Sequence, residues 1–180
     1  MLSIHYQGSC EPNIMQKLIW ELKAISEEMQ WKYTILDDEK FLGIIISLEE
    51  KCEPLYFIIN NQGRLINLAW LNDENPDDDA FYIAVKTNFS TIDIHIVIVK
   101  LLKYIKRKYI HNLKVTDEGD YYETGNKEVL TQKWNLLLEK FKEVSELLET
   151  NLNPDNQILT TDELIDKIEI LLDKYLNENE

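Results

Sequence analysis

The residues whose types and spacing could do chemistry gather in one acidic turn. Residues 117–124 read Asp-Glu-Gly-Asp-Tyr-Tyr-Glu-Thr, and His111 lies a few positions upstream. Hard divalent cations such as Mg²⁺ and Mn²⁺ prefer carboxylate oxygens. The turn offers four such groups: Asp117, Glu118, Asp120 and Glu123. If they converge, a metal-dependent enzyme could use this acidic cluster around Asp117.

Two readings of the turn need no metal. Gly119 allows the chain to reverse, and neither a second histidine nor a carboxylate pair at helical spacing completes a ligand set. A solvated hairpin is therefore favoured over a metal site, and we expect no metal and no cofactor. Aromatic residues flanked by charge suit a protein interface. We assign six residues to an interaction surface: Asp117, Glu118, Asp120, Tyr121, Tyr122 and Glu123.

The remaining chain offers no catalytic motif. Cys10 and Cys52 lack an adjacent histidine, and the sequence contains no Gly-x-Ser-x-Gly elbow. Its five glycines form neither a phosphate-binding loop nor a dinucleotide fingerprint. We assign no catalytic residue, and we favour a non-enzymatic interaction module over an enzyme.

A second acidic run, residues 72–79, invites comparison with a calcium-binding loop. An EF-hand loop starting at Asp73 requires glycine at its sixth position and glutamate at its twelfth. The chain has Asp78 and Ala84 there. The run therefore predicts a disordered acidic loop between two strands, which could attract a cationic partner.

The overall charge favours a basic protein partner. The chain has 33 acidic and 19 basic residues and a net charge of −14, which repels nucleic acids and anionic membranes at long range. The basic face of Lys100, Lys103 and Arg107 lacks interleaved aromatics for base stacking. No apolar run is long enough to cross a bilayer. We therefore expect a basic protein partner, no nucleic acid and no membrane.

The cysteines and the first residues predict a cytoplasmic protein. Residues 1–8 show neither a charged segment followed by an apolar one nor a small-residue cleavage site. Cys10 and Cys52 lie far apart, which suits two reduced thiols.

The elements that would position these residues predict an α+β fold. A strand over 2–6 precedes a helix that opens at Pro12, where proline is tolerated. The expected apolar face of this helix is Ile14, Leu18, Leu22, Ile25 and Met29. Short β-branched or aromatic runs then predict an antiparallel meander over residues 31–36, 41–48, 55–60, 64–71 and 81–86.

Residues 91–109 are expected to form a second helix. Residues 92–99 also alternate like a strand, but Leu101, Leu102 and Ile105 extend a helical apolar face. The preceding Ser90-Thr91-Ile92-Asp93 resembles a capping box.

The last part of the chain predicts an α-helical hairpin. Apolar residues recur at spacings of four and three at positions 130, 134, 137, 141, 144 and 148, and again from Leu164 to Tyr175 after a capping box at 160–163. We expect a domain over 1–126 with an antiparallel sheet of five to six strands and two helices packed on it. A C-terminal hairpin over 127–180 would pack on that domain or on a second subunit, which leaves a homodimer open.

One stretch resembles a known group of sequences. Residues 85–124 combine Val-Lys-Thr, a helix and Asp-Glu-Gly-Asp-Tyr-Tyr-Glu-Thr. This combination resembles a family of small uncharacterised bacterial proteins. The resemblance implies a bacterial origin and a role for the acidic turn, and it brings no activity with it.

Overall fold

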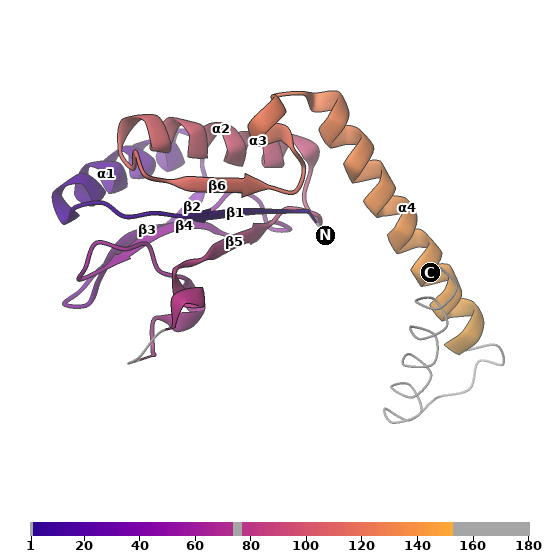
Figure 1. Ribbon diagram of the computed structural model, residues 1–180, viewed down its shortest axis with the longest axis horizontal. Helices are drawn as coiled ribbons and strands as arrows, with labels where there is room; N and C mark the ends of the chain where they lie inside the picture. Colours follow the sequence, from indigo (N-terminus) through magenta and orange to yellow (C-terminus); the bar gives the residue numbers. More distant parts are fainter. Residues whose placement is uncertain (1, 74–76, 153–180) are drawn as a thin grey trace. The chain divides into compact units, whose positions relative to one another are not determined.

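The computed structural model describes residues 2–73 and 77–152, and the exposure of individual side chains as far as residue 143. The chain divides into two units, Met1–Trp134 and Asn135–Glu180. The first unit has the predicted α+β class (Figure 1). This unit ends at residue 134 and therefore includes the first two turns of the last described helix.

Two three-stranded antiparallel sheets form the framework. Every described strand pair in them is antiparallel. The first sheet has the order β5 (Ile83–Lys86), β1 (Ser3–Gln7), β6 (Lys114–Asp117). The second has the order β2 (Lys32–Asp37), β3 (Phe41–Ser47), β4 (Leu55–Asn60).

The expected single sheet of five to six strands is thus corrected to two sheets, and residues 64–71 are not a strand. The N–H groups of residues 65–67 bond to three different segments. Leu65 donates to the carbonyl of Gly8 at 2.9 Å, Ile66 to Ile58 at 2.9 Å and Asn67 to Ala80 at 2.7 Å. Since no single partner strand receives these bonds, no ladder forms. A short helix, η1 (Leu68–Trp70), follows, and the Asn67 side chain caps it.

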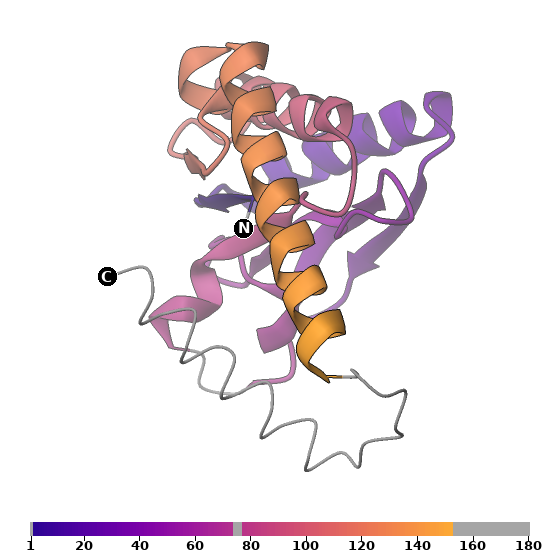
Figure 2. The same ribbon diagram turned by 90° about the vertical axis from the view of Figure 1, so that its right-hand side faces the viewer.

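Helices α1 (Pro12–Glu28) and α2 (Ile92–Lys108) lie side by side on one face of the sheets (Figures 1 and 2). The Glu21 carboxylate joins them, because it accepts hydrogen bonds from three groups at the end of α2: Tyr104, Lys108 and Tyr109. The buried face of α1 is rotated from the expected one. Met15 and Ile19 are buried, whereas Met29 is 54% exposed.

The helical prediction for residues 91–109 is confirmed. Thr91 rather than Ser90 is the N-cap, and its hydroxyl accepts from the N–H of Ile94. Asp93, expected to complete a capping box, instead forms an ion pair with Lys127 at 2.8 Å. The inner face of α2 buries His95 and several aliphatic residues: Ile96, Ile98, Val99, Leu102 and Ile105.

After β6 come a single helical turn, α3 (Tyr121–Thr124), and a long helix, α4 (Lys127–Leu152). Helix α4 corresponds to the first helix of the predicted hairpin, and its residues Leu130 and Trp134 are buried. The second helix of that hairpin falls outside the described residues. Among the described helices, none is both long and apolar enough to cross a membrane.

Candidate functional site

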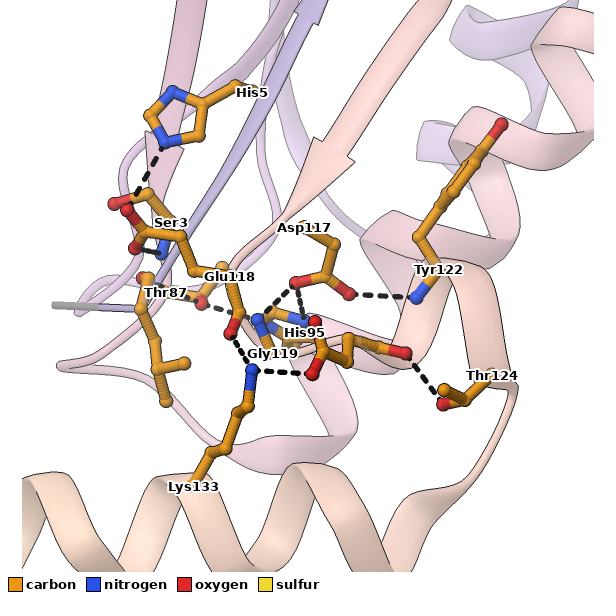
Figure 3. A network of polar contacts seen from close by, with 12 residues as sticks. Ser3, His5, Thr87, His95, Asp117, Glu118, Gly119, Tyr122, Thr124 and Lys133 are labelled. Carbon is orange, nitrogen blue, oxygen red and sulfur yellow. Dashed lines mark hydrogen bonds and ion pairs between the residues drawn. The ribbon is translucent and has the colours of Figure 1, made fainter.

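The acidic turn is positioned by the end of β6, and its first residue points inward (Figure 3). Asp117 pairs with Ile4 of β1 and is only 3% exposed. Its Oδ1 accepts the N–H of Gly119 at 2.7 Å, and its Oδ2 accepts the N–H of Tyr122 at 2.8 Å. The carboxylate of Asp117 therefore holds the turn in shape from within.

The Asp117 carboxylate also faces a buried histidine on α2. His95 Nε2 lies 3.0 Å from Asp117 Oδ1, although the ring N–H is not aligned well enough for a good hydrogen bond. His95 Nδ1 lies 2.7 Å from the hydroxyl of Thr87. The Leu2 carbonyl already accepts the Thr87 N–H at 3.0 Å. The Thr87 hydroxyl donates to the same carbonyl at 3.2 Å, so its oxygen is left to accept from His95 Nδ1, and His95 lies between Thr87 and Asp117.

The surroundings of Asp117 keep it ionised. Burial raises the pKa of this carboxyl, but the contact with His95 and the N–H groups of Tyr122 and Gly119 oppose burial. The net result is a pKa below its ordinary value of 3.8. The turn is thus held by a charged carboxylate at neutral pH.

Thr87, His95 and Asp117 stand in the order of a proton relay, but the cluster is closed to substrates. His95 is fully buried, and the Trp134 ring meets it edge-on with centroids 6.2 Å apart. A Cβ at Gly119 would lie 2.6 Å from Leu130 Cδ1 and 3.0 Å from His95 Nε2. A side chain at position 119 would displace Leu130, so the cluster is closely packed beneath the turn.

The four carboxylates of the turn do not converge. They face different partners: Asp117 faces His95, Glu118 accepts the N–H of Ser3, and Asp120 pairs with Lys133 at 2.6 Å. Glu123 is exposed. Across residues 2–73 and 77–152, no three side chains of metal-ligating type come together.

The other predicted interaction residues lie nearer the surface than Asp117. Glu118 and Glu123 are exposed, and Asp120, Tyr121 and Tyr122 are partly buried. The Lys103 ammonium lies 5.1 Å from the centroid of the Tyr122 ring, a cation–π contact. The turn thus keeps a mixed acidic and aromatic outer side, while Asp117 serves its interior.

A second acidic feature joins Asp73, from the predicted acidic run at 72–79, to two acids that the sequence analysis did not single out. A hollow of about 560 Å³ lies between the β2–β3 hairpin and the chain after η1. We call it the acidic hollow. Three carboxylates line it, from Asp38, Glu39 and Asp73, together with the apolar side chains of Leu36, Phe41 and Leu71.

The hairpin turn fixes one wall of the acidic hollow. Asp38 Oδ1 accepts the N–H groups of Lys40 and Phe41, each at 2.8 Å. This is the local side-chain-to-backbone bonding expected of aspartate in a turn. The run Asp37-Asp38-Glu39-Lys40 between two apolar strands was the available sequence signal.

The lining of the acidic hollow suits a long cationic side chain. Leu36 and Phe41 can cover the aliphatic stem of a lysine or arginine, while the carboxylates of Asp38 and Glu39 meet its charge. Among the described residues that line it, Lys40 is the one basic residue, against three acids. The local charge is therefore negative.

Compared with known proteins, the chain matches no family model, no curated protein and no solved structure.

Proposed function

We propose that the protein is a non-enzymatic interaction module that binds a basic protein partner through the acidic hollow. The observation that carries this proposal is the combination of an apolar floor with the carboxylates of Asp38, Glu39 and Asp73. A net charge of −14 adds long-range attraction for a cationic partner. The outer side of the turn, at Glu118 and Glu123, is a second contact for the same partner.

The chemistry of the cysteines supports a role without covalent catalysis. Burial raises the pKa of Cys10 and of Cys52 to about 11, so both thiols are protonated at neutral pH and are poor nucleophiles. Their separation also supports a reducing, cytoplasmic setting. The resemblance over residues 85–124 supports a bacterial source.

The alternative, a metal-dependent enzyme using the acids around Asp117, needs carboxylates that converge. A metal ion that binds only the folded state raises the thermal midpoint of unfolding. Because the carboxylates do not converge, we expect millimolar Mg²⁺, Mn²⁺ or Ca²⁺ to leave that midpoint nearly unchanged. A saturable rise that Asp117→Asn abolishes would favour the enzyme over the interaction module.

The proposal is tested by capture of a partner from an extract of the native cell at low and moderate salt. The variant Asp38→Asn/Glu39→Gln removes two charges from the acidic hollow, and the asparagine retains an oxygen that can cap the turn. Glu28→Gln/Glu50→Gln removes two exposed charges elsewhere and is the matched control.

A basic protein should be retained by the unmodified chain and by the control, and lost from the hollow variant as salt rises. Equal capture by both variants, or no enrichment of any basic protein, would contradict the proposal.

A further inference from the structure

A second hollow, of opposite charge, lies at the end of β1. Gln7 and Ser9 are two positions apart, so they project to the same face of the extended chain. Gln7 pairs with Lys114 of β6, and Ser9 forms an antiparallel bridge with Arg64. Cross-strand partners share a face. The two cations therefore flank the end of β1 on one side.

These residues line a hollow of about 300 Å³. We call it the basic hollow. The Arg64 guanidinium lies over the ring of Phe81, 3.4 Å from its centroid. Stacking uses the flat face of the guanidinium and leaves its N–H edges free to donate.

Polar neighbours add further donors to the basic hollow. Asn112 holds Ser9 in place, because its Oδ1 accepts the Ser9 N–H at 3.1 Å and its Nδ2 donates to Ser9 Oγ at 2.8 Å. With Oγ accepting from Asn112, the Ser9 hydroxyl proton is left to donate to a ligand. The Gln7 amide also lines the hollow.

No carboxylate balances these cations. None of the described residues that line the basic hollow is acidic. Neither Arg64 nor Lys114 forms an ion pair with any residue in the described part of the chain. In a chain with 33 acidic and 19 basic residues, two unpaired cations on one polar hollow form a local positive site.

We propose that the basic hollow binds the oxyanion group of a small molecule, a phosphomonoester or a carboxylate. Arg64 donates through its planar edge, Lys114 supplies a second charge, and the Ser9 hydroxyl completes the donor set. A net charge of −14 repels an extended polyanion at long range, which selects a small ligand over a nucleic acid. This site is independent of the acidic hollow.

The test titrates the full chain with inorganic phosphate, phenyl phosphate and benzoate, followed by amide chemical shifts. Saturable shifts are expected at Ser9, Arg64 and Lys114. Arg64→Gln and Lys114→Gln should each weaken binding by about tenfold or more, because each removes a charge-assisted contact. Lys17→Gln removes an exposed charge on α1 and should leave the affinity unchanged.

Arg64→Lys keeps the charge and loses the planar fork, so it should bind more weakly than the unmodified chain. If Arg64→Gln fails to fold because the stack on Phe81 is lost, the exposed Lys114→Gln decides alone. Stronger binding of phenyl phosphate or of benzoate identifies the ligand class. Absence of saturable binding by all three probes, or an equal loss in Lys17→Gln, would overturn the proposal.

Discussion

The acidic turn and the acidic hollow are both clusters of carboxylates, yet their carboxylates face in different directions. In the turn, Asp117 is buried, accepts two backbone N–H groups and faces His95. In the hollow, Asp38 and Glu39 surround an apolar floor at the surface. The difference shows that the role of an acidic run depends on what distant segments place beside it. Beside His95 a buried carboxylate supports its turn, whereas in the hollow Asp38 bonds its own turn through Oδ1 and the exposed Glu39 lies beside an apolar floor.

The largest expected effect on stability comes from removing the buried carboxylate of Asp117. Asp117→Ala should lower the free energy of unfolding by about 3 to 5 kcal/mol, because His95 Nε2 and two backbone N–H groups lose the buried carboxylate that faces them. Urea denaturation measures the change. Glu123→Ala, on the exposed side of the same turn, should stay within about 0.5 kcal/mol of the unmodified chain. Similar losses in both variants would contradict a buried structural role for Asp117.

A slightly smaller effect is expected from the aromatic residue that covers the His95 cluster. Trp134 is 6% exposed and meets His95 edge-on. Trp134→Ala should lower the free energy of unfolding by about 3 kcal/mol through lost burial and a residual cavity. Leu138, on the same helix, is 50% exposed, and its replacement by alanine should cost under about 1 kcal/mol. An unchanged melting temperature for Trp134→Ala would show that the cluster does not depend on this covering ring.

The stabilisation by Asp117 should depend on pH. The folded structure lowers the pKa of Asp117 below its ordinary value of 3.8. The resulting stabilisation is complete above 3.8 and is lost as the pH falls through the folded-state pKa. The difference in unfolding free energy between the unmodified chain and Asp117→Asn should therefore narrow as the pH falls from about 5. A difference that stays constant would mean that the charge of Asp117 does not stabilise the fold.

The smallest effect on stability is expected in the acidic hollow. Glu39→Gln should change the free energy of unfolding by less than about 0.5 kcal/mol, because Glu39 is exposed and no hydrogen bond of the fold is lost. The same change should weaken binding of a basic partner in a salt-dependent way. Thermal unfolding and calorimetric titration measure the two quantities. A marked loss of stability would show that Glu39 supports the fold, as Asp117 does.

Helix positions were the most predictable part of the fold. Pro12 and Thr91 mark the starts of α1 and α2 through local backbone chemistry, which the sequence shows directly. The sheet was less predictable. Residues 64–71 have strand composition, but the N–H groups within 65–67 bond to three different segments. These hydrogen bonds depend on tertiary contacts, which a local sequence pattern does not predict.

The sequence predicts which acidic residues form the turn, but it does not predict which way their side chains point. The sequence identifies the acids of residues 117–123, but the inward orientation of Asp117 depends on His95 and Thr87, which lie far upstream. The acidic hollow likewise joins the β2–β3 hairpin to Asp73. The residues that line the acidic hollow are far apart in the sequence, and only the fold brings them together.

The central claim is that the acidic hollow is the surface that meets a cationic partner. The most direct measurement is amide chemical-shift mapping of the full chain with a lysine- and arginine-rich peptide at low and moderate salt. Saturable shifts should concentrate at residues 36–41 and 71–73, and Asp38→Asn/Glu39→Gln should abolish them. Glu118→Gln/Glu123→Gln, which neutralises the outer side of the acidic turn, should leave most of the binding intact. Shifts spread evenly over all exposed acids, or equal loss in both variants, would contradict the account.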